Sequence, residues 1–198
     1  MTKGKAFIVS GPSGVGKSTV LSALLARRKD LYFSVSATTR ARRPEEKDGV
    51  NYHFLDVDTF REWIARDEFL EYAEYVGNFY GTPKRFVDEA MNRGQDVILD
   101  IEIQGAIQVT GKRPDTVTIF IAPPSWVELE RRLTDRGTNS PEEIQKRLLR
   151  AKVEVQTAHT YNYFVINDNV ENAVRELEAI MMAEHCKPKE RMEILNGG

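Results

Sequence analysis

Four short apolar runs alternate along the chain with longer amphipathic segments. The runs span residues 6–9, 97–100, 116–121 and 164–166, and each is typical of a buried strand. Residues 32–36 alternate apolar and polar side chains and predict one more strand. Strands that alternate with helices indicate a parallel sheet with helices on both faces, so we expect an α/β fold.

Capping signals mark where the intervening helices begin and end. Ser125 with Glu128, and Ser140 with Glu143, have the spacing of capping boxes, so a helix is expected to start at each place. Further helices are expected after residue 16, over 58–64, from Pro83 to about Gly94, and over 169–184.

The segment between residues 36 and 83 breaks this alternation. Residues 38–48 are polar and charged, which indicates an exposed loop, and aromatic and β-branched residues then gather between 50 and 80 around a Gly77-Asn78 turn. We interpret this segment as a small, mostly β insertion in the parallel-sheet core.

Residues 11–19, with the sequence GPSGVGKST, form the strongest motif of the chain. They follow a predicted strand, precede a predicted helix and fill every fixed position of the phosphate-binding P-loop, G-x-x-x-x-G-K-[ST]. The glycines let backbone N–H groups point at an anion, and the helix dipole adds positive potential. Lys17 would reach the outer phosphates and the Ser18 hydroxyl would ligate Mg²⁺. The expected nucleotide-binding residues are Gly11, Ser13, Gly14, Val15, Gly16, Lys17, Ser18 and Thr19.

Composition restricts the other functions that the chain could have. Its 198 residues and formal net charge of -2 argue against a general nucleic-acid or membrane-surface binder. Cys186 is the single cysteine, which excludes an internal disulfide and a cysteine-rich zinc site. The first apolar run is too short for a signal peptide, and no stretch approaches the ~18 apolar residues of a membrane span. We therefore expect a soluble, cytoplasmic protein.

The insertion carries side chains that suit a phosphorylated purine. Arginine forks bind phosphate, and a carboxylate can accept two parallel hydrogen bonds from N1 and N2 of guanine, a pair of donors that adenine does not offer. Taken singly, these residues could be solvated loop charges, core-edge aromatics or a surface carboxylate, and only their occurrence beside a P-loop favours binding. The set is Ser36, Arg40, Arg43, Tyr52, Glu71, Tyr80 and Thr82, and Asp100, at the end of a strand, is the candidate second Mg²⁺ ligand.

Six stretches give the chain a resemblance to guanylate kinases of the bacterial single-domain kind. They are residues 10–19, 36–44, 48–54, 77–82, 100–105 and 136–138, in the family's order. The resemblance implies ATP-dependent phosphorylation of GMP and dGMP by in-line phosphoryl transfer with Mg²⁺, as part of purine nucleotide metabolism. It also implies a division into core (1–35), GMP-binding insertion (36–83), core (84–124), helical lid (125–157) and core (158–198).

The same resemblance assigns roles to single residues. Arg40, Arg43, Tyr52 and Tyr80 would hold the GMP phosphate, and Ser36, Glu71, Thr82 and Glu102 would contact the guanine edge. Glu102 is a departure, because the family has Asp there. Asn167 would contact the ATP adenine. Lys17 and the lid arginines Arg132, Arg136 and Arg147 would be catalytic, shielding the transferred phosphoryl group. No histidine is needed as a general base, because the acceptor phosphate, with a second pKa of ~6, is already ionised at neutral pH.

Three other functions remain open on the sequence alone. A guanylate-kinase-like binding module would typically have an eroded ATP site, whereas Gly16, Lys17 and Asp100 are present here. A GTPase would need an Asn-Lys-x-Asp signature, which we do not find. A P-loop kinase for another small acceptor, such as a phosphorylated sugar, would leave Glu71 and Ser36 without a role. The expected partners are GMP or dGMP and ATP, without nucleic acid or membrane, and a homo-oligomer remains open.

Overall fold

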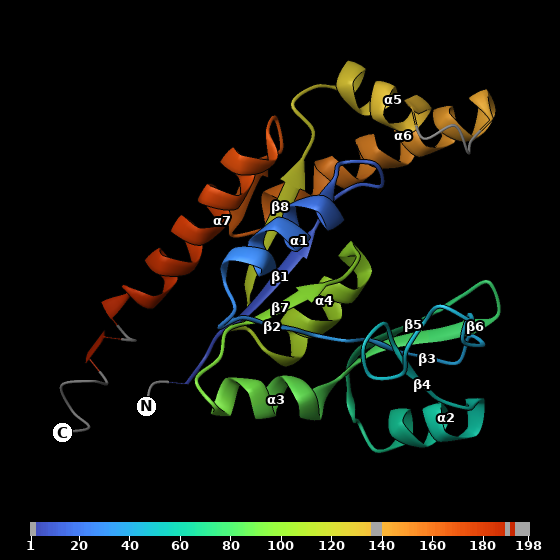
Figure 1. The fold of residues 1–198 in the computed structure, drawn as a ribbon, viewed down its shortest axis with the longest axis vertical. Helices are drawn as coiled ribbons and strands as arrows, with labels where there is room; N and C mark the ends of the chain where they lie inside the picture. Colours follow the sequence, from blue (N-terminus) through green and yellow to red (C-terminus); the bar gives the residue numbers. More distant parts are fainter. Residues whose placement is uncertain (1–2, 136–139, 189–190, 193–198) are drawn as a thin grey trace. The chain divides into compact units, whose positions relative to one another are not determined.

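The computed structural model describes residues 3–135, 140–188 and 191–192, which fold as two compact units (Figure 1). The first unit contains Lys3–Ile8 and Asp30–Val117, and the second contains Val9–Lys29 and the chain from Thr118 onward. Strand β1 (Ala6–Ser10) passes from the first unit into the second, and all five of its residues are buried.

The first unit contains one part of the parallel sheet, with the strand order β2-β7-β1. β2 (Tyr32–Phe33) runs parallel to β7 (Val97–Asp100), with Tyr32 opposite Val97. Helix α3 (Lys84–Asn92) packs against β7 and is followed by Gly94 at φ 78°. The strand expected over 32–36 is therefore shorter than predicted, because the chain leaves this sheet after Phe33.

A second sheet in the first unit has the strand order β4-β3-β6-β5. Its strands are β3 (Ala37–Thr38), β4 (His53–Phe54), β5 (Phe69–Tyr75) and β6 (Asn78–Pro83), and α2 (Val57–Ala65) accompanies them. The rings of Phe60 and Phe69 stack at 4.3 Å in its core. The predicted exposed loop is wrong at its first residue, because Thr38 is fully buried and its hydroxyl donates to the Phe79 carbonyl at 2.9 Å.

Helix α4 (Ile103–Lys112) follows β7 and packs against β5. The sequence did not predict it, because Gly105 and Gly111 weaken the helical signal of its apolar residues. The apolar spacing is nevertheless present, since Ala106 and Val109 are buried three residues apart.

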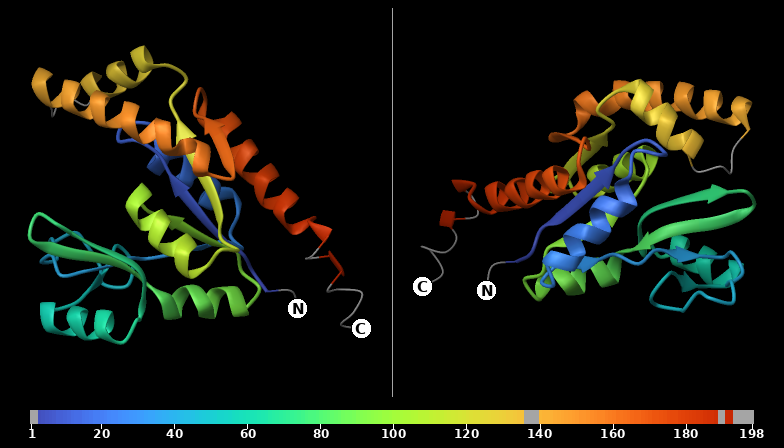
Figure 2. Two further views of the ribbon diagram at one scale, coloured as in Figure 1. Left: turned by 180° about the vertical axis from the view of Figure 1, so that it is seen from behind. Right: turned by 45° about the horizontal axis from the view of Figure 1, so that its top comes forward.

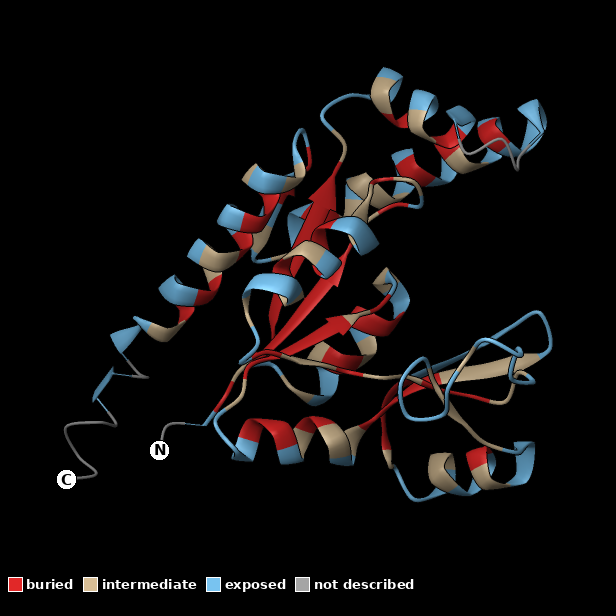
Figure 3. Cartoon of the chain, viewed as in Figure 1, coloured by how far each residue is buried: buried red, intermediate tan, exposed pale blue. Residues whose placement is uncertain are grey.

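The second unit contains the strand order β1-β8-β9. β8 (Val117–Ala122) and β9 (Tyr163–Ile166) are parallel, with Ile119 opposite Tyr163. Helices α1 (Lys17–Arg27) and α7 (Val170–His185) pack against each other, and α7 also packs on β9. Figure 3 shows β1 and β8 buried along their length, and β7 is buried except at Asp100, its last residue. The predicted α/β class with a parallel sheet is confirmed.

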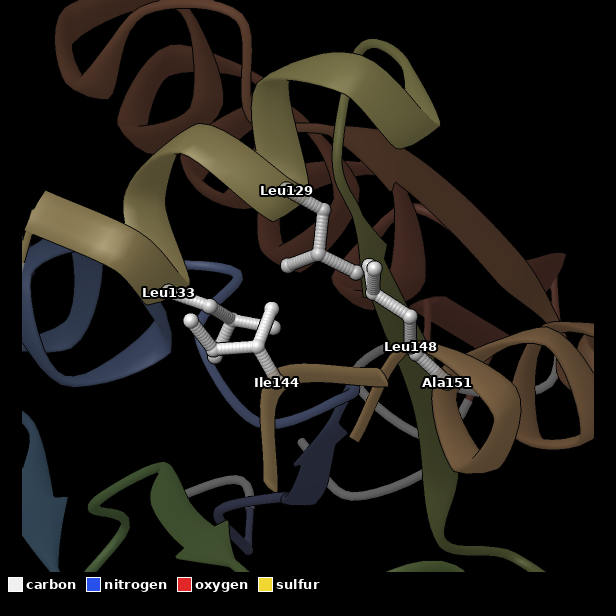
Figure 4. Close-up of a cluster of buried hydrophobic side chains, with 5 residues drawn as sticks. All are labelled: Leu129, Leu133, Ile144, Leu148 and Ala151. Carbon is white, nitrogen blue, oxygen red and sulfur yellow. The ribbon is translucent and has the colours of Figure 1, made fainter. Parts of the chain in front are cut away.

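Helices α5 (Trp126–Asp135) and α6 (Pro141–Gln156) run side by side in the second unit (Figure 2), and the short 3₁₀ helix η1 (Thr157–Thr160) follows them. The capping box predicted at Ser140 and Glu143 is confirmed, and Ser125 accepts from the Glu128 N–H at 3.1 Å. Apolar side chains of α5 and α6 meet between the two helices (Figure 4), namely Leu129, Leu133, Ile144, Leu148 and Ala151. In the described part of the chain, no helix combines the length and the apolar character that crossing a membrane requires.

Candidate functional site

The P-loop connects β1 to α1 in the second unit and has a backbone that only glycine adopts readily. Gly14 and Gly16 have φ angles of 90° and 91°, in the left-handed region. A Cβ atom at Gly14 would lie 2.7 Å from a methyl carbon of Leu133, and one at Gly16 would lie 2.7 Å from the Asn167 amide nitrogen. The loop therefore packs directly under α5 and beside the end of β9, with its backbone at the N-terminus of α1, where an anion is favoured.

A cavity of about 370 Å³ opens beside this loop. It lies entirely within the second unit. The residues that line it come from the P-loop, from α1, from α5 and from the segment after β9: Gly14, Gly16, Thr19, Arg132, Asp135, Asn167, Asp168 and Val170. Three of the predicted ATP-site residues and one predicted lid arginine are thus brought together with Asn167.

Arg132 connects α5 to both walls of this cavity. Its guanidinium donates to the Val15 carbonyl at 3.0 Å, to the Asn167 carbonyl at 3.0 Å and to the Glu128 carboxylate at 2.8 Å. Hydrogen bonds from Arg131 and Arg132 hold the pKa of Glu128 at about 2. These three contacts hold the Arg132 side chain in place on the P-loop.

Asn167 is almost completely buried between the P-loop and α5, at 3% exposure. Its Nδ2 donates to the Val15 carbonyl at 2.8 Å, which fixes the orientation of the amide. Within the described residues, the buried Oδ1 has no hydrogen-bond partner. An oriented and unsatisfied acceptor of this kind suits an amino group on a ligand.

The predicted metal ligands are one hydroxyl and one carboxylate. Ser18 is exposed in the first turn of α1, and Asp100 is partly buried at the end of β7. In the part of the chain that the structure describes, no three His, Cys, Asp or Glu side chains gather as metal ligands. Such a site still fits Mg²⁺, which usually takes only one or two protein ligands and completes its shell with water and phosphate oxygens. Ser18 and Asp100 belong to different units, so their joint role stays a prediction.

In the first unit, Glu71 and Thr82 form a buried polar pair on adjacent strands. The Thr82 hydroxyl donates to Glu71 Oε1 at 2.6 Å. Thr82 is 1% exposed and Glu71 is 8% exposed. Burial raises the pKa of Glu71, and the nearby negative charge of Glu102, the N-cap residue of α4, raises it further. The hydrogen bonds from Thr82 act in the opposite direction. The site therefore presents an oriented carboxylate in a poorly solvated environment.

Arg40 lies among aromatic rings in the same unit. Its guanidinium carbon is 5.5 Å from the centre of the Tyr52 ring, and the Tyr52 and Tyr80 rings meet edge to face at 6.1 Å. Two of the predicted phosphate-binding phenols are thus placed beside one of the predicted guanidinium groups. Ser36 is partly buried just before β3, and its carbonyl accepts from the His53 N–H at 2.9 Å.

Glu46 is a residue of this region that the sequence did not single out. Its carboxylate accepts from Arg40 Nη2 at 2.6 Å and from the Arg43 backbone N–H at 2.8 Å. The Arg40 guanidinium and the Arg43 N–H keep the pKa of Glu46 below its ordinary value. In the sequence, Glu46 could be recognised only as a carboxylate in an arginine-rich loop. Glu45 has the same property, so the sequence alone does not show which of the two contacts the arginines.

Two further predicted arginines have side chains that reach solvent. The side chain of Arg43 is exposed, and Arg147 is partly exposed on α6. Arg136 lies outside the described residues, as does the predicted connection at 137–139. His53, for which no catalytic role was expected, stacks on Phe86 at 4.4 Å, and burial lowers its pKa.

Known proteins resemble this chain over nearly its whole length. The family model for guanylate kinase matches residues 3–184. A guanylate kinase from Clostridium perfringens is 50% identical over 185 residues, which cover 93% of this chain and 86% of the relative. A guanylate kinase from Thermus thermophilus is 52% identical over 182 residues, which cover 92% of this chain and 82% of the relative. The crystal structure of guanylate kinase from Anaplasma phagocytophilum has a TM-score of 0.73 and 34% identity, covering 94% of this chain and 89% of that one.

Proposed function

Because the chain belongs to the guanylate kinase family, and is therefore a kinase, we propose that it transfers the γ-phosphoryl group of ATP to GMP. A phosphate oxygen of GMP forms a bond to the γ-phosphorus, the bond from that phosphorus to the bridging oxygen of ADP breaks, and GDP and ADP leave. We expect dGMP to react as well, since the residues proposed for the acceptor contact base and phosphate.

The burial and orientation of Glu71 support GMP as the acceptor of the phosphoryl group. Its carboxylate is buried and oriented by Thr82, so its remaining lone pairs can accept from N1–H and N2–H of guanine. Adenine would present the N1 lone pair to the same carboxylate, leaving a buried charge unsatisfied. Ser36 and Glu102 complete the proposed contacts to the base.

The other end of GMP requires cationic and hydroxyl donors. Arg40, Arg43, Tyr52 and Tyr80 are proposed to hold the phosphate, and the Arg40 guanidinium already lies against the Tyr52 ring. Guanidinium groups bind phosphate with two parallel hydrogen bonds. These bonds orient the attacking oxygen and balance the negative charge of the phosphate.

ATP is proposed to bind at the P-loop, with its phosphates on the backbone N–H groups of residues 11–19 and on Lys17. Asn167 Oδ1, unsatisfied among the described residues, supplies an acceptor for the amino group of the adenine. Ser18 and Asp100 would hold Mg²⁺, which when bound neutralises charge on the phosphates. Arg132, Arg136 and Arg147 would shield the transferred phosphoryl group, for which Arg132 must give up a carbonyl contact to the P-loop.

Two substitutions test this assignment, because one should affect the KM for GMP and the other should affect kcat. We expect Glu71→Ala to raise the KM for GMP by about 10² or more, since a buried donor-acceptor pattern discriminates steeply, and to leave the KM for ATP within about twofold. Lys17→Ala should lower kcat by about 10³ with GMP affinity retained. Steady-state kinetics with both nucleotides varied, together with GMP titration calorimetry, measure these effects. Equal effects of Glu71→Ala on both KM values would contradict the proposed acceptor site.

A further inference from the structure

One side of α4 contacts the strand that carries Glu71. Gly105, Gln108 and Lys112 are spaced by three and four residues, so they lie along the same side of the helix. All three meet β5, and all lie in the first unit. This row is the helix face that borders the candidate base site.

Gln108 and Lys112 hold the main chain of β5 on both sides of Glu71. The Gln108 amide pairs with the backbone of Tyr72, accepting from its N–H at 3.2 Å and donating to its carbonyl at 3.1 Å. The Lys112 ammonium donates to the Phe69 carbonyl at 2.7 Å. These contacts fix the height and register of the strand relative to α4 at the point where Glu71 projects.

Gly105 lies directly behind the Glu71 carboxylate. A Cβ atom at Gly105 would be 3.0 Å from Glu71 Oε2 and 3.2 Å from its carboxyl carbon. Gly105 is buried in a regular helical turn and is not among the described glycines with positive φ, so its conformation does not require glycine. In a helix interior, glycine is about 1 kcal/mol less favourable than alanine. Room for Glu71 is therefore the physical reason for a glycine at this position.

We propose that Gly105, supported by Gln108 and Lys112, is a specificity-determining positioning residue that sets where the Glu71 carboxylate meets the guanine base. The inference rests on the proposed function, because it takes Glu71 as the residue that recognises guanine. An added methyl group would displace the carboxylate by a few tenths of an ångström and disturb its hydrogen bond from Thr82. Both guanine contacts would then be misaligned, although no binding group has been removed.

Gly105→Ala tests the inference, with Gly111→Ala as its matched control on the same helix. A Cβ atom at Gly111 would meet nothing within 4 Å, so that variant reports only the effect of alanine in α4. We expect Gly105→Ala to raise the KM for GMP about tenfold with the KM for ATP within twofold, because small misplacements of a binding group have large effects. Inosine monophosphate lacks the 2-amino group of GMP. The ratio of the affinity for GMP to the affinity for inosine monophosphate, measured by calorimetry, should fall severalfold in Gly105→Ala. Gly111→Ala should match the unsubstituted protein in all three quantities.

The outcomes separate this inference from the proposed function. If Gly105→Ala matches Gly111→Ala while Glu71→Ala still impairs GMP selectively, Gly105 is not a positioning residue and the proposed function stands. If the unsubstituted protein does not phosphorylate GMP, both are overturned. Should Gly105→Ala fail to fold in a thermal melt, Gln108→Ala replaces it, with Ile107→Ala, at an exposed neighbouring position, as its control. A KM for GMP raised about threefold in Gln108→Ala alone supports the inference, and equal kinetics of the two variants overturn it.

Discussion

Glu71 is a buried carboxyl group, and without a bound nucleotide few hydrogen-bond donors stabilise its negative charge. Burial raises its pKa, and the hydrogen bonds from Thr82 offset only part of that effect. Guanine N–H donors would supply the missing stabilisation of the ionised form. We thus expect the residue proposed to select the substrate to lower the free energy of unfolding of the protein without GMP.

We therefore expect Glu71→Gln to raise the Tm of the free protein at pH 7–8 by a few degrees. In the unfolded chain the Glu71 carboxyl group ionises near the ordinary glutamate pKa of 4.5, whereas the folded state resists ionisation because its pKa is raised. The folded state therefore loses stability as pH rises from about 4.5 through the raised pKa of Glu71. Glutamine does not ionise, so the Glu71→Gln variant does not lose this stability. The Tm difference should vanish below about pH 4, where the carboxyl group is protonated in both the folded and the unfolded state.

Thermal melts from about pH 3 to pH 8, with and without GMP, measure this effect. GMP should raise the Tm of the unsubstituted protein more than that of Glu71→Gln, because only the carboxylate accepts both guanine donors. A destabilising effect of Glu71→Gln at pH 8 would show that the ionised carboxylate is well stabilised without a ligand.

In the loop between β3 and β4, one carboxylate contacts both of the arginines proposed to bind phosphate. Glu46 joins the Arg40 guanidinium to the Arg43 backbone, and Arg40 in turn lies on the Tyr52 ring. The sequence placed this segment correctly as mostly exposed loop, but it could not distinguish Glu46 from Glu45. Adjacent residues share the same composition signal, and only the path of the backbone decides which of them reaches the guanidinium.

We expect Glu46→Ala to raise the KM for GMP by about tenfold, because Arg40 loses the partner that orients it toward the phosphate. Glu45→Ala, which removes the same charge from the neighbouring position, should change it by less than twofold. Kinetics at two ionic strengths measure both variants. A lower KM for GMP in Glu46→Ala would show instead that Glu46 competes with the phosphate for Arg40.

Most helices and strands of the chain could be predicted because their signals are local. The apolar runs of β1, β7 and β8 and the capping box at Ser140 are examples. Helix α4 was missed because Gly105 and Gly111 oppose a helical assignment, and the structure shows that room for Glu71 outweighs propensity at Gly105. The two-residue strand β3 was missed because pairing with β4 and β6, not its own sequence, defines it.

At the scale of the molecule, each unit contains one candidate nucleotide site. The P-loop cavity lies in the second unit, and the pair of Glu71 and Thr82 lies in the first. The P-loop residues and the insertion residues were predicted from motif and resemblance, and their binding roles stay predictions. The anchoring of Arg132 to the Val15 and Asn167 carbonyls could not, because backbone acceptors leave no mark in the sequence. Family membership removes the GTPase and the sugar-phosphate kinase as alternatives.

The proposed reaction is the transfer of a phosphoryl group from ATP to guanine mononucleotides. The most direct test measures ADP formation from ATP and Mg²⁺ with GMP, dGMP, AMP, CMP and UMP offered one at a time. We predict turnover with GMP and dGMP, and values of kcat/KM lower by about 10⁴ for the other three, because none of their bases offers two adjacent N–H donors to the Glu71 carboxylate. Comparable turnover with AMP, or no turnover with GMP by a folded protein, would contradict the proposed reaction and its acceptor site.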